Sequence, residues 1–397
     1  MKMTKKNITF CALVLILVFE SIIKYQGVNW VTNEYGTLAS MTGKSLGVFV
    51  ASSLLVVSIL LLFSLRKENK TILICGYFLI VFGVIWSIAD YKGLTLFYLN
   101  ASPILLICFG MIYMIGQSNI IQLCMEKSCG YLAIFYTVLS FINALYFMKN
   151  YTKMRMADGK VIEYFALALF LTAIWNLVAV QSKTSVFLIY ILCVIHIITS
   201  SIIVSRGWFL QACTLTVFCH LSNSDRSSKY KVVRIFVTIL CSLIVGIILM
   251  YYFNDSFEFL FARLYEDTRT GQYQIFFKQV SIIDLLVGKG LNAHYKFGAN
   301  GDYQAIDNQF IYWMFKYGAF PMICYLTPFV LAIVRAFVNH DSRELLLKRI
   351  YVPLMWVASM AGISIYYGLK MDIAHFYILL TIVRLAIKPY ISIRGGK

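Results

Sequence analysis

The sequence predicts an all-α polytopic membrane protein with about 12 transmembrane helices. Its 397 residues are 60% hydrophobic and only 13% charged, whereas a soluble domain usually carries about 25% charged residues. Apolar runs of about 20 residues recur along the chain, and a run of that length crosses a hydrocarbon core of about 30 Å. The predicted spans cover residues 7–24, 45–65, 71–90, 94–115, 130–148, 163–181, 184–204, 207–222, 232–253, 318–337, 350–368 and 372–388.

The first span follows the basic stretch "MKMTKK". A secretory signal peptide would end in a small-residue cleavage site, and none precedes Lys24. We therefore expect residues 7–24 to form a permanent helix. Polar connections, such as "RKENK" at 66–70, separate the later apolar spans. Twelve alternating spans place both termini in the cytoplasm.

The distribution of Lys and Arg agrees with this orientation. Twenty of the 35 basic residues fall on the predicted cytoplasmic side, together with only five acidic residues. Cytoplasmic loops carry such an excess because it directs membrane insertion. The net charge of +17 is thus explained by topology, and we expect no nucleic-acid partner. Fifteen basic residues remain on the outer side, which is more than orientation requires.

The ten cysteines give no sign of disulfides, metal or cofactor. None of them falls in a predicted outer loop, where an oxidising compartment would form bridges. Their spacing, and that of the five histidines, matches no metal-binding pattern. We therefore predict small apolar packing residues, no metal and no cofactor.

Residues 1–397 are predicted to form a single integral membrane domain. Two outer connections are long, at 149–163 and 254–317, and the second is the large periplasmic loop. Neither an internal repeat nor a pair of matched broken helices, typical of inverted-repeat transporters, is evident.

The end of that loop predicts an interfacial helix. Residues 307–317 read "DNQFIYWMFKY" and are followed by Gly318. Asp307 is a good helix N-cap, and aromatic residues such as Trp313 are enriched at the headgroup level. A helix lying in the outer interface would keep Lys316 out of the bilayer, and Gly318 would separate it from the next span.

Three outer features contain candidate anion-binding arginines. Arg206 lies in "SRG", a very short connection between two spans, and must sit at the membrane surface. Arg263 and Arg269 flank two acids in "RLYEDTRTG", and Arg155 lies in the basic loop "KMRMADGK". Guanidinium groups match phosphate oxygens bidentately, and the anion found at this depth is a lipid phosphate or diphosphate. Fixed cations stabilise the charge that grows on a departing diphosphate.

Each arginine also has a simpler interpretation, which stays open. Arg206 could be a lone arginine that reaches toward headgroups. Arg263 could pair with Glu266 and Asp267 at helical spacing, and Arg155 could belong to a solvated basic loop. Arg269 has no acid ahead of it at helical spacing, so it is the better candidate to face a ligand.

These motifs together resemble the bacterial O-antigen polymerase and ligase superfamily over roughly residues 160–335. The resemblance rests on "SRG" after a middle helix, on an outer loop containing "RTGQYQIFFKQVSIIDLLVGKG", and on "DN" followed by nine residues and then Gly318. It implies an all-helical membrane glycosyltransferase whose donors are undecaprenyl-diphosphate-linked glycans. Arg206 and Arg269 would contact the diphosphate, Gly288 and Gly290 would shape the loop, and Asn308 and Gly318 would position the interfacial helix.

One departure from the family separates its branches. Ligases have His immediately before this Asn, whereas this chain has Asp307, which favours the polymerase branch. Asp307 could accept the proton of the acceptor hydroxyl, or it could be only a cap. His294 and Glu266 are further candidate bases.

The resulting prediction is an O-antigen or surface polysaccharide polymerase in the bacterial inner membrane, with its active site facing the periplasm. Catalysis is assigned to Asp307, Arg269 and Arg206. Its partners would be the undecaprenyl-diphosphate-linked oligosaccharide and membrane lipid, with a chain-length regulator protein as a further candidate. The substrate-binding residues would be Arg206, Arg263, Arg269, Arg155, Asn308 and His294.

Two alternatives remain. An O-antigen ligase would use the same arginines with a different acceptor. A transporter or flippase of lipid-linked glycans would use buried ionisable residues near the midplane, for which Glu20, His196, His220 and His375 are candidates.

Overall fold

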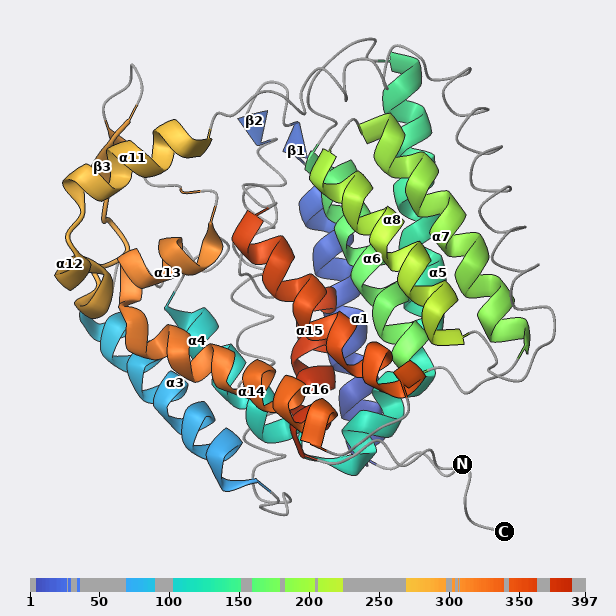
Figure 1. Ribbon diagram of the computed structural model, residues 1–397, viewed down its shortest axis with the longest axis horizontal. Coiled ribbons are helices and arrows are strands. Elements are labelled where there is room, and N and C mark those ends of the chain that lie inside the picture. Colours follow the sequence, from blue (N-terminus) through green and yellow to red (C-terminus); the bar gives the residue numbers. More distant parts are fainter. Residues whose placement is uncertain are drawn as a thin grey trace.

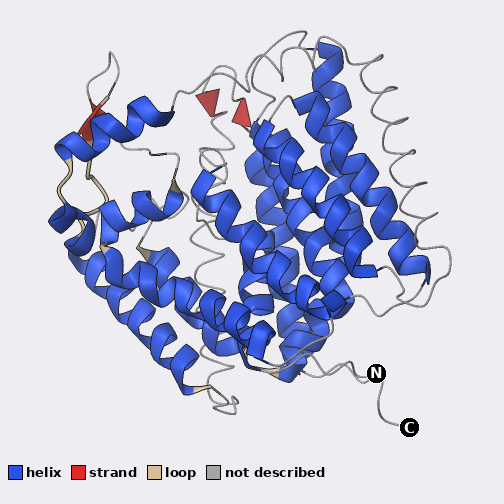
Figure 2. Ribbon diagram, in the orientation of Figure 1, coloured by secondary structure: helices blue, strands red, loops and turns tan. Residues whose placement is uncertain are grey.

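In the residues that it describes, the computed structural model contains helices and two short antiparallel ladders (Figures 1 and 2). It describes residues 5–26, 28–29, 34–35, 69–89, 103–150, 159–178, 183–203, 206–223, 269–297, 302–303, 306, 308–338, 343–362 and 372–387. The thirteen helices in these residues are α1 (Lys5–Gln26), α3 (Lys70–Ala89), α4 (Ile104–Ile115), α5 (Asn119–Asn150), α6 (Gly159–Val178), α7 (Lys183–Ile203), α8 (Arg206–Asn223), α11 (Arg269–Gln279), α12 (Ile282–Val287), α13 (Gln309–Tyr317), α14 (Ala319–Val338), α15 (Arg343–Gly362) and α16 (Ile373–Ile387). The strands are β1 (Val28–Asn29), β2 (Glu34–Tyr35), β3 (Tyr295–Lys296) and β4 (Asp302–Tyr303).

These helices have the length and composition expected of a polytopic membrane protein. Within the described residues, α3, α5, α7 and α14 are each long and apolar enough to cross a membrane. Ten of the predicted spans coincide at least in part with a helix, and the spans predicted at 45–65 and 232–253 lie outside the described residues. The all-α fold is thus confirmed for the described residues. The two short ladders were not predicted from the sequence.

Helices α4, α6 and α16 are almost completely buried, and in α4 only Ile104 and Ile107 are not. From Ile162 to Val178 only Trp175 of α6 is not fully buried, and from Asp372 to Ile387 only two residues of α16 are not. Because side chains on every side of α6 and α16 are buried, protein encloses both helices. By contrast, α3 and α14 expose large apolar side chains along one side, as helices that face lipid do.

Close backbone approach joins α3 to α4. A Cβ atom added to Gly76 would lie 2.9 Å from the carbonyl oxygen of Gly110, and a Cβ atom on Gly110 would collide with the carbonyl oxygen of Gly76. Small residues at such crossings let membrane helices pack by van der Waals contact, because lipid supplies no hydrophobic force between them.

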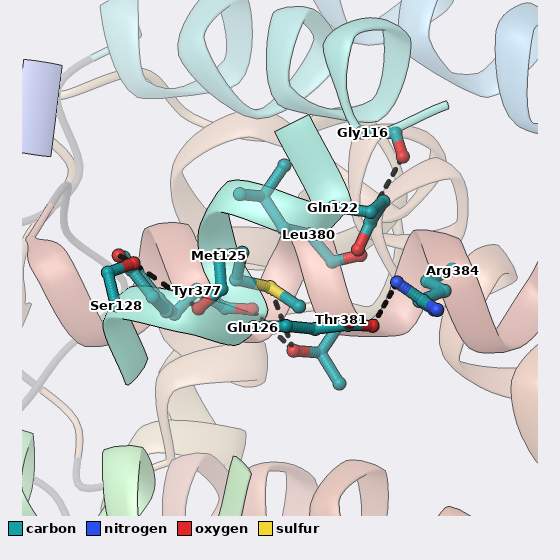
Figure 3. A network of polar contacts seen from close by, with 9 residues as sticks. All are labelled: Gly116, Gln122, Met125, Glu126, Ser128, Tyr377, Leu380, Thr381 and Arg384. Carbon is teal, nitrogen blue, oxygen red and sulfur yellow. Dashed lines mark hydrogen bonds and ion pairs between the residues drawn. The ribbon is translucent and has the colours of Figure 1, made fainter. Parts of the chain in front are cut away.

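The start of α5 differs from the prediction. Residues 116–129 were expected to form a cytoplasmic loop, but α5 is one continuous helix of 32 residues from Asn119. Several polar residues of this stretch contact α16 (Figure 3). Glu126 forms an ion pair with Arg384, and Gln122 Nε2 donates to the carbonyl oxygen of Leu380 at 2.8 Å. The remaining contacts join Gln122 to Gly116, Ser128 to Tyr377 and Thr381 to Met125.

A second set of polar contacts joins the ends of three other helices. The Nζ atom of Lys348 in α15 donates to Oδ1 of Asn223 at 2.7 Å, and Nδ2 of Asn223 donates to Oδ1 of Asn176 at 2.7 Å. Lys348 was expected in a loop before a span at 350–368, but α15 begins at Arg343 and includes it. The ends of α6 and α8 and the start of α15 therefore meet at one end of the bundle.

Candidate functional site

The candidate site is a small helical layer that we call the α11–α13 unit: α11, α12, the loop 288–297, β3, β4 and α13. It lies at the left of Figure 1, in gold to orange, beside α3, α4 and α14. The unit has its own core around Phe276, whose ring lies edge-on to Tyr295 at 5.1 Å and to Phe315 at 5.2 Å. β3 pairs with β4, with Tyr295 opposite Tyr303.

Helix α13 connects this unit to the membrane helices. Phe315 faces the core of the unit. Trp313 packs against Phe109 of α4 at 5.7 Å between ring centroids, and Tyr317 packs against Trp86 of α3 at 5.6 Å. Both of these aromatic side chains are fully buried.

The predicted helix at 307–317 is present as α13 with nearly the expected bounds, and its position in the membrane interface stays a prediction. Protein packs against two of its sides: Phe315 contacts the core of the unit, and Trp313 and Tyr317 contact α4 and α3. Aromatic side chains around a single lysine are typical of an interfacial helix, and they also suit contacts between two protein layers.

The N-cap of α13 is Asn308 and not Asp307. The Oδ1 atom of Asn308 accepts hydrogen bonds from the backbone N–H groups of Phe310 at 3.0 Å and Ile311 at 3.1 Å. Asn and Asp are equally good caps, so adjacent residues of these types cannot be ranked from sequence. The capping role expected of Asp307 is thus taken by its neighbour. Asp307 itself lies outside the described residues, and its role as a base stays a prediction.

The G-x-G loop binds the opposite end of α13. The backbone N–H of Lys289 donates to the carbonyl oxygen of Phe315 at 2.9 Å, and that of Gly290 donates to the carbonyl oxygen of Lys316 at 2.8 Å. The last carbonyls of a helix have no partner within the helix. Here the loop supplies those partners.

Two glycines make this contact sterically feasible. Gly288 has φ 88° and ψ 150°, and Gly318 has φ 90° and ψ 168°, a region that is essentially restricted to glycine. A Cβ atom on Gly288 would lie 2.6 Å from the backbone nitrogen of Gly318, and one on Gly318 would lie 2.7 Å from the carbonyl oxygen of Leu286. The two chain segments pass each other at backbone contact.

Lys316 adds a side-chain contact to the same place, the contact between residues 288–293 and the end of α13, which we call the joint. Its side chain is fully buried, and its Nζ atom donates to the carbonyl oxygens of Leu291 at 2.5 Å and Ala293 at 2.6 Å. The ammonium group also lies 5.5 Å from the ring centroid of Tyr312, whose pKa burial raises to about 12. A lysine inside an apolar run is therefore explained by carbonyl ligands within the protein.

Replacing Lys316 by methionine should loosen this joint. We expect a cost of about 1–3 kcal/mol for each carbonyl group left without a partner. Backbone amide exchange of residues 288–293, followed by hydrogen–deuterium exchange mass spectrometry, should accelerate. Lys296→Met is the matched control, because Lys296 is exposed in the same loop. Equal exchange in the two variants would show that Lys316 does not hold the loop.

The structure places the other predicted site residues only in part. Arg206 is the first residue of α8 and Arg269 is the first residue of α11, and their side chains lie outside the described part. Arg155, Arg263 and Glu266 lie outside it altogether. Arg269 thus begins the unit that also contains Asn308, Gly288, Gly290 and Gly318, whereas Arg206 begins a helix of the bundle.

His294 lies exposed on the loop of this unit. Its Nδ1 atom lies 3.0 Å from the carbonyl oxygen of Asn292. A carbonyl oxygen only accepts, so Nδ1 carries the proton in this contact. In the neutral ring Nε2 is then the basic nitrogen, which keeps His294 a candidate proton acceptor.

A buried polar cluster behind α13 was not predicted as a site, although His375 was a candidate residue for the transporter alternative. Tyr325 OH lies 2.8 Å from Nε2 of His375 and accepts a hydrogen bond from Nε1 of Trp356 at 2.8 Å. Asp372 caps α16 by accepting from the backbone N–H of His375 at 2.8 Å, and Tyr113 OH donates to the carbonyl oxygen of Tyr325 at 2.5 Å. These contacts bind α4, α14, α15 and α16 together. Asp372 before an apolar run was the available signal, since it is a typical N-cap.

The cluster is joined to α13 by one ring. Phe109 lies 4.6 Å from His375 and 5.7 Å from Trp313 between ring centroids. His375 and Tyr325 are fully buried. Through Phe109 the cluster packs against Trp313 and so supports the position of α13.

Among the described residues, no three His, Cys, Asp or Glu side chains gather as metal ligands. Comparison of the chain with protein-family models, with curated proteins and with solved structures finds no match.

Proposed function

We propose that this protein is a membrane glycosyltransferase that polymerises O-antigen or another surface polysaccharide at the outer face of the bacterial inner membrane. It transfers the growing glycan from undecaprenyl diphosphate to a sugar hydroxyl of the next lipid-linked repeat unit. The proposal starts from the resemblance to the O-antigen polymerase and ligase superfamily over residues 160–335. Its orientation in the membrane is part of the proposal.

The observation that carries the proposal is the convergence of motif residues on one joint. Gly288, Gly290 and Gly318 form the contact between the loop and the end of α13, and Asn308 caps its start. The resemblance assigns these four residues to the shape of the loop and the position of the helix. Residues that arose by chance would not be expected to share one structural task.

The two principal arginines stand where an anion would be favoured. Arg206 begins α8 and Arg269 begins α11. Unpaired N–H groups and the helix dipole make a helix N-terminus attractive to phosphate, and a guanidinium fork adds bidentate hydrogen bonds. Both features support a role of these residues in holding the donor diphosphate, with Arg155 or Arg263 assisting.

In the proposed reaction the acceptor hydroxyl oxygen attacks the anomeric carbon of the donor glycan. The bond between that carbon and the diphosphate oxygen breaks, and undecaprenyl diphosphate leaves with the electron pair. Arg206 and Arg269 stabilise the negative charge on the leaving group. The hydroxyl proton passes to a base, for which Asp307 is the first candidate and His294 the second.

A reconstituted assay tests this function. Vesicles containing the purified protein and an undecaprenyl-diphosphate-linked repeat unit should yield lipid-linked glycans of increasing length together with free undecaprenyl diphosphate. Product that forms only when lipid A core is added would identify a ligase. Movement of the intact substrate across the vesicle, without a change in glycan length, would identify a transporter.

The transporter alternative draws on one specific observation. His196, Asp372 and His375 are buried within the bundle, and transporters often place ionisable residues there. His196 Nε2 lies 3.0 Å from Oγ1 of Thr172, and the other two belong to the cluster behind α13. Glu20 has its side chain outside the described part, and His220 lies near Tyr190, 3.4 Å from its hydroxyl.

A further inference from the structure

Helix α12 exposes four of its five apolar side chains. Its six residues read "IIDLLV", and none of them is fully buried. Ile282, Ile283, Leu286 and Val287 are between 57% and 77% exposed. Only Leu285 packs against the core of the α11–α13 unit. A contiguous apolar surface of this kind marks a binding face.

This surface adjoins the side of α14 that faces away from the bundle. The end of α12 touches the start of α14, since a Cβ atom on Gly318 would lie 2.8 Å from the carbonyl oxygen of Val287. From there α14 exposes a stripe of large apolar side chains. Its members are Phe320, Ile323, Val330, Val334, Phe337 and Val338. α14 is long and apolar enough to cross a membrane, so this stripe is the part of the helix that lipid would cover.

The end of α3 lies on the same side. Gly290 lies next to Trp86 of α3. A Cβ atom added to Gly290 would lie 3.6 Å from the ring of Trp86. Phe78 of α3 packs edge-on against Phe320 at 5.3 Å. In Figure 1, α12 lies at the left edge beside the upper ends of α3 and α14. Ile88, near the end of α3, is strongly exposed as well. The apolar surface of both membrane helices thus continues onto α12.

The remaining side of α12 is polar and charged. Ser281 Oγ accepts from the backbone N–H of Asp284 at 3.2 Å, and Asp284 Oδ2 accepts from the backbone N–H of Ser281 at 2.8 Å. The hydrogen bond from the backbone N–H of Ser281 is the main cause that lowers the pKa of Asp284. Lys289 lies 3.2 Å from the same carboxylate. The helix therefore has a charged edge beside its apolar face, the arrangement of a helix that lies at a membrane surface.

We propose that α12 is a membrane-interface anchor, with Ile282, Ile283, Leu286 and Val287 inserted among the lipids that surround the ends of α3 and α14. Asp284 and Lys289 remain at the headgroup level. The anchor fixes the height of the α11–α13 unit above the bilayer. This assignment does not depend on the proposed reaction, because it uses only the apolar faces and the contacts of the unit.

Photocrosslinking in lipid nanodiscs tests the anchor. Benzoylphenylalanine is placed at position 283 or 286 of the full chain, in discs of phosphatidylethanolamine and phosphatidylglycerol, and adducts are measured by mass spectrometry. Position 278 is the control, because Lys278 is exposed on α11. We expect several-fold more lipid adduct at 283 and 286 than at 278. Equal yields would overturn the proposal, and a crosslinked dimer in place of lipid adducts would show that a second copy covers this face.

A charged variant separates insertion from simple proximity. Benzoylphenylalanine at position 287 should give lipid adducts in the wild-type background. Ile283→Glu combined with Leu286→Glu should reduce them to the level of position 278, since charged side chains disfavour burial among acyl chains. Both side chains are exposed, so the variant keeps the packing of the unit. Unchanged adducts in the double variant would contradict insertion.

Discussion

Replacing Arg269 by alanine should lower polymer synthesis by about 10²–10³-fold, the loss seen when a donor to a developing anion is removed. The same loss is expected for Arg206→Ala. In both variants the diphosphate still binds the remaining groups. It loses one cation, whose attraction for the diphosphate oxygens increases as the glycosyl bond breaks and negative charge develops. The measurement is the rate of glycan elongation in the reconstituted assay, and the length pattern of surface polysaccharide in a complemented deletion strain.

Two variants on the same helix provide the controls. Lys278→Ala removes an exposed cation from the last turn of α11 and should leave synthesis unchanged. Arg269→Lys keeps the charge but loses the fork that binds two oxygens, so its activity should fall between wild type and alanine. If Arg206→Ala and Arg269→Ala both leave polymer length and amount unaltered at equal protein level, the polymerase proposal is wrong.

Substitution of Gly318 should have the largest effect on stability. Gly318→Ala places a Cβ atom 2.7 Å from one backbone carbonyl oxygen and 2.8 Å from another. The backbone conformation alone costs about 1–3 kcal/mol for a residue other than glycine, and the collision adds to this cost. We expect α13 to separate from the G-x-G loop, with faster amide exchange over residues 286–293 and loss of activity.

Two other glycines divide this effect into its causes. Gly290 has φ 87°, but a Cβ atom there would meet its nearest neighbour only at 3.6 Å, so Gly290→Ala reports backbone strain without collision. Gly271 lies within α11 with open space around a Cβ atom, and Gly271→Ala should be neutral or stabilise by about 0.5–1 kcal/mol. The expected order of damage is Gly318, then Gly290, then Gly271. A different order would mean that the joint is more adaptable than its geometry indicates.

Sequence reasoning located the membrane helices more reliably than their surroundings. The span predicted at 318–337 is α14 at Ala319–Val338, because a long apolar run ends at clear breakers. The start of α5 was missed, since glutamine and glutamate are typical of a loop in sequence, whereas in the structure Gln122 and Glu126 contact α16 from within a helix. The contacts of α13 with α3 and α4 were not predicted either. Lipid and protein interior are both apolar, and hydropathy alone does not distinguish them.

The candidate site was predictable in its backbone and not in its contacts. The glycines at 288, 290 and 318 indicated special conformations, and the structure gives all three a positive φ. Nothing in the sequence paired Gly288 with Gly318 or directed Lys316 to the carbonyls of Leu291 and Ala293. Such pairings join segments that are 23 to 30 residues apart, and short-range patterns carry no information at that separation.

The position of α16 bears on how the protein assembles during synthesis. This helix is enclosed by α1, α4, α5, α6, α14 and α15, all of which leave the ribosome before it does. These earlier helices must therefore leave space for α16, or move apart when it is inserted. Until then the carboxylate of Glu126 and the amide of Gln122 lack their contacts on α16. The docking of α16 is thus a late step of assembly, on which contacts of six earlier helices depend.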